Sequence, residues 1–204
     1  MSDAPGLDAA LVAARPQAVA ALLRYFRDLD LAEEAFQDAC LRALDTWPRD
    51  GLPRDPTAWL IMVGRNRTID ALRRRQRQQP LPDADELPDP HEGEAVLVER
   101  LDAADYRDDL LRLLFTCCHP ALPPAHQVAL ALRVVSGLST AQVARAFLVG
   151  ESAMEQRITR AKARIAAAGL PIDTPGPAER AARLASVASM LYLLFNAGYS
   201  EAPA

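Results

Sequence analysis

Residues that favour strands are scarce in this sequence. Aromatic residues make up only 5% of its 204 positions, and runs of β-branched residues are rare, whereas alanine, leucine and arginine are abundant. This composition argues against a sheet and predicts an all-α fold. No apolar run approaches the roughly 20 residues of a membrane-spanning helix, and the N-terminus lacks the basic and then apolar pattern of a secretory signal. We therefore expect a cytoplasmic protein with no membrane partner.

Cysteine is also scarce and is not arranged for ligation or cross-linking. The three cysteines are Cys40 and the adjacent pair Cys117 and Cys118, an odd number without the spacing of metal ligands. We expect reduced thiols packed in the interior, with no metal and no cofactor. The sequence also lacks a nucleophile paired with a base and a glycine-rich phosphate loop, so we expect that the protein is not an enzyme.

The net charge of −4 conceals two basic blocks. Residues 65–77 hold six arginines and a single acid, Asp70, and residues 133–164 are basic again. Between them, acids dominate residues 83–105, and prolines are frequent in the first part of that stretch. This pattern predicts two anion-binding modules joined by a self-repelling linker at 80–104. A set of solvated charged faces is the alternative reading.

The first module is predicted to contain three helices. The first spans residues 16–29, after a short helix that begins at Leu7. The second spans 31–47, with Asp30 as its N-cap. A loop at 48–55 separates it from the third helix because proline and glycine interrupt the helical pattern there. A loop held between two stiff helices can form a pocket for something small, such as an extruded base, and a plain helix–helix connection is the alternative.

The third helix, residues 55–77, carries two rows of side chains at helical spacing. Asp55 is expected to cap it, with Pro56 at the first helical position. One row is apolar: Met62, Ile69 and Leu72, with the stem of Arg65 between them. The other row begins aromatic, becomes amide and carboxylate, and ends cationic: Trp59, Val63, Asn66, Asp70, Arg73 and Arg77. Such a row offers stacking, base-edge and phosphate contacts, whereas a buried amphipathic helix with a solvated basic end is the alternative.

The second module is predicted to end in a helix-turn-helix. After helices at 106–118 and 125–135, a short helix begins near Ser139 and a longer basic helix runs from Ser152 to residue 168. A turn at 148–150 that contains glycine joins the two. Both helices open with a capping-box pattern. The predicted base-edge contacts are Ser152, Glu155 and Gln156, and the predicted phosphate contacts are Arg157, Arg160, Lys162 and Arg164.

Several motifs resemble an extracytoplasmic-function (ECF) sigma factor of bacterial RNA polymerase, in the sigma-70 family. Similar to its region 2 are AEEAFQDA at 32–39, PTAWL at 56–60 and RNRTIDALRR at 65–74. Similar to its region 4 are LPP at 122–124, LRVVSGLS at 132–139, VA at 143–144 and RITRAK at 157–162. The resemblance implies region 2 at 1–79, an acidic linker at 80–104 and region 4 at 105–170.

The resemblance implies a role for each module. Region 2 would bind the clamp helices of the polymerase β′ subunit through Glu33, Glu34, Gln37 and Asp38. It would melt the -10 element and hold the DNA through Trp47, Asp50, Trp59, Asn66, Asp70, Arg73, Arg74 and Arg77. Region 4 would read the -35 element through Ser152, Glu155, Gln156, Arg157, Arg160 and Lys162, and would bind the β flap. The opening of the last helix, ESAM at 151–154, departs from the usual pattern, so the base preference stays open.

The C-terminal residues resemble a sigma-factor subgroup with a helical, TPR-like extension. FTCCHP at 115–120 and LYLLFNAGYS at 191–200 carry this resemblance. Residues 171–204 would be the start of the extension, with one apolar helix at 178–195 packed on the body. The chain is then either a piece of a longer protein or a natural short form, and its regulator is either this extension or an anti-sigma factor.

Two other functions compete with a sigma factor. A stand-alone helix-turn-helix regulator would bind duplex DNA without polymerase. A helical protein-interaction scaffold would use neither basic block for nucleic acid.

Overall fold

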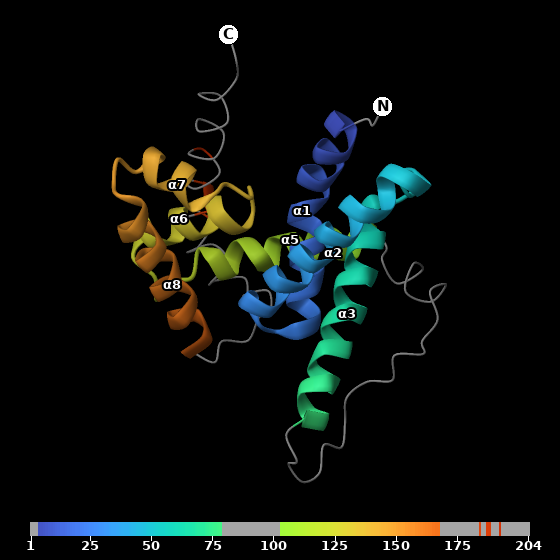
Figure 1. Ribbon diagram of the computed structural model, residues 1–204. Coiled ribbons are helices and arrows are strands. Elements are labelled where there is room, and N and C mark those ends of the chain that lie inside the picture. Colours follow the sequence, from blue (N-terminus) through green and yellow to red (C-terminus); the bar gives the residue numbers. More distant parts are fainter. Residues whose placement is uncertain (1–3, 79–102, 168–183, 185–186, 189–191, 193–204) are drawn as a thin grey trace.

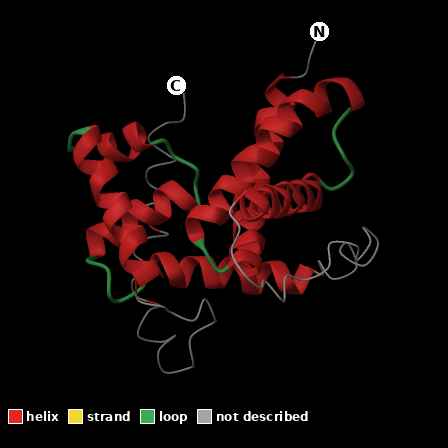
Figure 2. Ribbon diagram, turned by 60° about the horizontal axis from the view of Figure 1, so that its bottom comes forward, coloured by secondary structure: helices red, strands yellow, loops and turns green. Residues whose placement is uncertain are grey.

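The computed structural model describes residues 4–78 and 103–167, with residues 184, 187–188 and 192 near the C-terminal end. Every element of regular secondary structure in these ranges is an α-helix, which confirms the predicted all-α fold (Figures 1 and 2). They are α1 (Ala4–Phe26), α2 (Leu29–Asp50), α3 (Pro56–Gln78), α5 (Ala103–Cys117), α6 (Pro124–Val134), α7 (Thr140–Ala146) and α8 (Glu151–Ala167). The predicted linker at 80–104 and the C-terminal helix at 178–195 lie almost wholly outside the described residues.

The first three helices pack on one another as a bundle. α1 runs continuously through Pro16, although the sequence predicted a break there. Proline removes one helical hydrogen bond. The continuous burial of residues 18–23 in α1 compensates for this loss, because these side chains pack only if the helix continues.

α1 is more apolar than the sequence analysis expected. Its residues Gly6–Phe26 are long and apolar enough to cross a membrane by length and composition, with a mean hydropathy of 1.3. In the structure, however, Val19, Leu22 and Leu23 are buried in the core that α1 forms with α2, α3 and α5. We therefore describe α1 as the central core helix of the bundle.

α2 begins earlier and ends later than predicted. Its N-cap is Asp28, whose side chain accepts a hydrogen bond from the Leu31 N–H at 2.9 Å, so the prediction of Asp30 as the cap was wrong. At the other end the helix continues through the exposed Pro48 to Asp50. Gly51, with φ of 83°, ends it and donates its N–H to the carbonyl of Trp47. The predicted loop at 48–55 therefore shortens to 51–55.

α3 matches the predicted helix closely. Asp55 Oδ1 accepts a hydrogen bond from the Ala58 N–H at 3.0 Å, as expected of the cap. The face against the bundle differs, however: the buried residues are Leu60, Ile61, Gly64, Arg65, Thr68 and Ile69, and the predicted Met62 and Leu72 are half-buried. The far end of α3 projects beyond its neighbours (Figure 1).

α5 connects the two halves of the molecule. It lies between the α1–α3 bundle and the α6–α8 group and packs mainly on α1 (Figure 1). Asp109 of α5 is 1% exposed and bridges Arg24 of α1, at 3.3 Å, and Arg112, at 2.9 Å. A single apolar core therefore runs from α1 to α8.

Candidate nucleic-acid interface

The polar edge of α3 is open to solvent. Asn66 and Asp70 are both exposed, one helical turn apart. Arg73 is half-buried, and Arg74 and Arg75 are exposed near the projecting end. The side chain of Arg77 lies outside the described residues. The amide, carboxylate and guanidinium groups predicted to meet DNA are therefore accessible together on one surface.

Two tryptophans meet beside the short loop at 51–55. The rings of Trp47 and Trp59 pack edge to face, with centroids 5.2 Å apart. Trp47 is 4% exposed, whereas Trp59 is half-buried and Asp50 is exposed. The predicted direct contact of Trp47 with DNA does not fit this burial. Its ring instead fixes the orientation of Trp59, which is the aromatic side chain available at this edge.

Arg65 is buried as a whole, whereas the sequence predicted only its stem in the apolar row. It is 8% exposed, and its guanidinium carbon lies 4.7 Å from the ring centroid of Tyr25 in α1. This cation–π contact places the charge inside the bundle. Arg65 therefore does not belong to the exposed basic end of α3.

α7 and α8 form the predicted helix-turn-helix. Ser139 and Gln142 make a complete capping box, which confirms the first of the two predicted. The second is wrong: α8 begins at Glu151, so Ser152 lies within its first turn. The residue of the turn with positive φ is Leu148 (φ 52°), which is 94% exposed, rather than the glycine at 150.

The outer face of α8 carries most of the side chains predicted to contact duplex, with Lys162 as an exception. Ser152, Glu155, Gln156 and Arg160 are exposed, whereas Met154, Ile158, Ala161 and Ile165 face the core. Arg157 is half-buried, with its guanidinium 5.4 Å from the ring centroid of Phe147.

His126 of α6 lies near three arginines of α8. Burial lowers the pKa of His126, and the charges of Arg157, Arg164 and Arg160 lower it further. The imidazole of α6 therefore lies within the combined field of three α8 arginines, a field that favours anions.

α2 presents an acidic face with apolar side chains. Glu34 and Gln37 are exposed and Asp38 is half-buried. Leu41 and Leu44 follow at helical spacing and are 63% and 48% exposed. Neither leucine was predicted at the surface from the sequence. The spacing 34, 37, 41, 44 is the signal that identifies them as one face.

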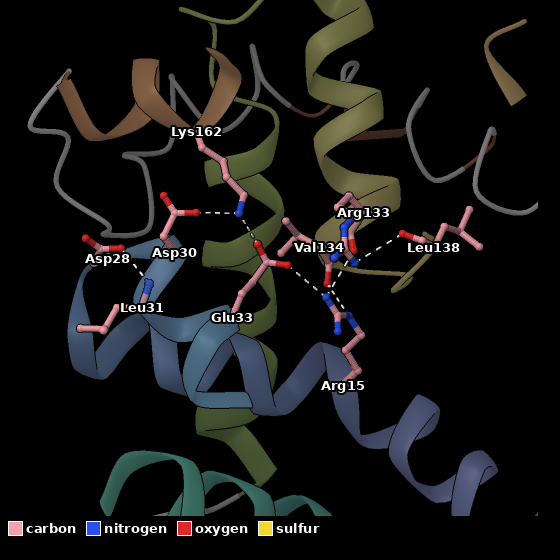
Figure 3. A network of polar contacts seen from close by, with 9 residues as sticks. All are labelled: Arg15, Asp28, Asp30, Leu31, Glu33, Arg133, Val134, Leu138 and Lys162. Atoms are coloured by element: carbon pink, nitrogen blue, oxygen red, sulfur yellow. Dashed lines mark hydrogen bonds and ion pairs between the residues drawn. The ribbon is translucent and has the colours of Figure 1, made fainter. Parts of the chain in front are cut away.

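Glu33, the remaining predicted residue on α2, faces the other way. It is 4% exposed, and its Oε2 lies 2.7 Å from Nζ of Lys162 on α8. The same ammonium lies 2.6 Å from Oδ1 of Asp30, and Arg15 contacts the other oxygen of Glu33 (Figure 3). The structure thus joins a predicted polymerase contact to a predicted DNA contact, and neither side chain is free at the surface in this state.

The cysteines pack in the interior as expected. Cys117 and Cys118 are buried, Cys40 is half-buried, and all three are free thiols. Burial raises the pKa of Cys40 to about 11, and Arg15 acts in the opposite direction. Within the described residues, no group of three or more His, Cys, Asp or Glu side chains is placed to hold a metal ion.

Comparison with known proteins matches both halves of the chain to regions of one protein family. The family model described as Sigma-70 region 2 matches residues 11–78, and the one described as Sigma-70, region 4 matches residues 112–165. An uncharacterized protein of Rhizobium meliloti (strain 1021) is 65% identical over 200 residues, which is 98% of this chain and 47% of that protein. The chain therefore spans about half the length of the curated relative that it matches.

Proposed function

Because this chain belongs to the sigma-70 family, with region 2 and an ECF-type region 4 in that order, we propose that it is an RNA polymerase sigma factor. It binds bacterial core polymerase, recognises the -35 and -10 promoter elements and promotes DNA melting. Its site of action is the cytoplasm. The observation that carries the proposal is the match of one chain to both Sigma-70 regions, at residues 11–78 and 112–165, with exposed polar and basic side chains on α3 and α8.

The α3 surface supports a role in strand separation. Asn66 and Asp70 offer hydrogen-bonding groups to an unpaired base, and Trp59 offers an aromatic ring beside them. The exposed arginines Arg74 and Arg75 lie farther along the same helix, where they are suited to phosphate contacts. Arg73 and Arg77 are proposed for the same role from their positions in the sequence.

The α8 surface supports recognition of intact duplex. Ser152, Glu155 and Gln156 lie in the first two turns of the second helix of a helix-turn-helix, which is the part that enters the major groove. Arg157 and Arg160 follow and are suited to phosphates. We propose that these residues read the -35 element and that the same module contacts the β flap.

The exposed face of α2 supports polymerase binding. We propose that Glu34, Gln37 and Asp38 contact the β′ clamp helices and that Leu41 and Leu44 add apolar contact area. The predicted residue Glu33 joins this surface only when its ion pairs to Lys162 and Arg15 open. We also propose that the activity of the sigma factor is controlled by an anti-sigma factor or by its C-terminal extension.

The test is transcription with purified core polymerase and a library of genomic fragments from the source organism. A sigma factor directs core polymerase to defined start sites on a subset of fragments and binds them weakly alone. Tight binding of duplex by the free chain, with no effect on polymerase, would instead support the stand-alone helix-turn-helix regulator. The match to region 2 favours the first outcome because such a regulator needs only the region 4 fold.

A further inference from the structure

Lys162 is the only lysine in the sequence, against 22 arginines. Its ammonium lies between two carboxylates of α2, 2.6 Å from Asp30 and 2.7 Å from Glu33 (Figure 3). A compact ammonium with three donors fits between two such oxygens, whereas the planar guanidinium of arginine is larger and fixed in geometry. The only lysine of the sequence thus stands where one cation meets two carboxylates.

Glu33 is held for this contact from the other side by Arg15. Nη2 of Arg15 lies 3.1 Å from Oε1 of Glu33, and its Nε and Nη2 also donate to the carbonyls of Val134 and Arg133, at 3.1 and 3.3 Å. A Cβ on Gly137 would lie 2.7 Å from Cδ of Arg15, so the arginine rests on the turn after α6. α1, α2, α6 and α8 are therefore linked through Glu33.

We propose that Lys162 is a charge switch: in the free protein it closes α8 onto Asp30 and Glu33, and in the promoter complex the same ammonium binds a DNA phosphate. This inference rests on the proposed function. The closed contact takes one residue from each proposed binding surface, Glu33 from the polymerase surface and Lys162 from the duplex-binding helix. It also places two carboxylates beside a helix that must approach phosphates, which opposes DNA binding until they are released.

The contact between Lys162 and the two carboxylates of α2 can open without unfolding α8. α8 meets α2 over a small area, and α8 packs far more extensively on α6 and α7. Asp30 is also largely exposed, with 71% of its side chain accessible. Lys162 can therefore exchange the carboxylates for a phosphate while the buried side chains of α8 stay in place.

A single lysine permits a direct test on the full chain. Labelling with 15N-lysine gives one side-chain ammonium signal in the NMR spectrum. We expect this signal to shift in Asp30→Asn and in Glu33→Gln, and to shift again when a short duplex of arbitrary sequence is added to the wild type. Asp45→Asn is the matched control because it removes one charge from an exposed position of the same helix.

DNA affinity provides the second readout. Asp30→Asn is expected to bind the duplex more tightly than Asp45→Asn. Its slope of log affinity against log salt is expected to equal that of the wild type, because the same ammonium binds one phosphate in both complexes. Asp30 is exposed, so this variant keeps the test available if Glu33→Gln does not fold. Equal affinities for Asp30→Asn and Asp45→Asn would overturn the proposal.

The two proposals fail in different ways. If the wild type directs transcription but its lysine signal is the same with and without duplex, the switch is refuted and the sigma-factor function stands. If the lysine signal moves from carboxylates to duplex but core polymerase gains no promoter activity, the switch is supported and the sigma-factor function is refuted.

Discussion

Gly64 of α3 and Ala35 of α2 are so close that a Cβ on Gly64 would lie 2.6 Å from the carbonyl oxygen of Ala35. Backbone, rather than a flexible side chain, occupies this space. The absence of a side chain at Gly64 therefore sets the distance between the two helices that carry the proposed polymerase and -10 surfaces.

We expect Gly64→Ala to lower the free energy of unfolding by about 1–3 kcal/mol, because α3 must move away from α2. In an open helix the same change stabilises by about 1 kcal/mol, so the sign of the effect is diagnostic. Urea denaturation measures it. Gly150→Ala is the control because a Cβ there meets nothing within 4 Å. A stabilising Gly64→Ala would contradict this packing.

Removal of the buried carboxylate on α5 is expected to weaken the connection between the two halves. Asp109→Asn loses the charge that pairs with Arg24 and Arg112. We expect a loss of about 2 kcal/mol in denaturant unfolding, since the two arginines stay partly solvated. Asp108→Asn, at the exposed neighbouring position, should change stability by less than about 0.5 kcal/mol. Equal effects of the two substitutions would show that the ion pairs contribute little.

Asn66→Ala and Asp70→Ala are expected to impair promoter melting more than polymerase binding. Both side chains are exposed, so their loss should leave folding intact and remove only contacts to DNA. Permanganate reactivity of unpaired thymines measures melting, and gel filtration with core polymerase measures binding. Parallel losses in both assays would argue against a specific role in melting.

Arg160→Ala is expected to weaken duplex binding at all sequences and to reduce the slope of log affinity against log salt by about 1, the effect of one lost phosphate contact. Arg157→Ala should weaken binding too and should also lower stability slightly, since its guanidinium packs on Phe147. Arg145→Ala serves as the control because Arg145 is exposed on α7 outside the proposed surface. If all three variants bind alike, α8 is not the duplex-binding helix.

Stability is expected to fall in the alkaline range. Burial raises the pKa of Cys40 to about 11 and raises that of Cys117 well above its usual value. These thiols ionise more readily in the unfolded chain, so their contribution is complete below pH 9 and is lost as the pH rises toward 11. Thermal unfolding between pH 8 and 11 measures this, and Cys40→Ala should reduce the decline. A decline of the same size in that variant would exclude Cys40 as a cause.

Local patterns in the sequence predicted the helices, the Ser139–Gln142 capping box and the open polar edge of α3, because each depends on residues within one or two turns. Pro16 and Pro48 were misjudged because tertiary packing and solvent exposure allow proline within a helix. The apolar face of α3 was misplaced because the close approach at Gly64 turns a different face toward α2. The pairing of Asp30 with Lys162, 132 positions apart, has no local signature at all.

α5 is counted with the second module by order along the chain, but by packing it covers α1. A gene divided between codons 79 and 102 would therefore not yield two self-sufficient products. The product with α1–α3 would expose the apolar side chains that α5 covers, and the other product would carry α5 without its packing partner, so we expect the two to associate when mixed. The boundary between the modules along the chain and the boundary in the packing therefore differ by one helix, α5.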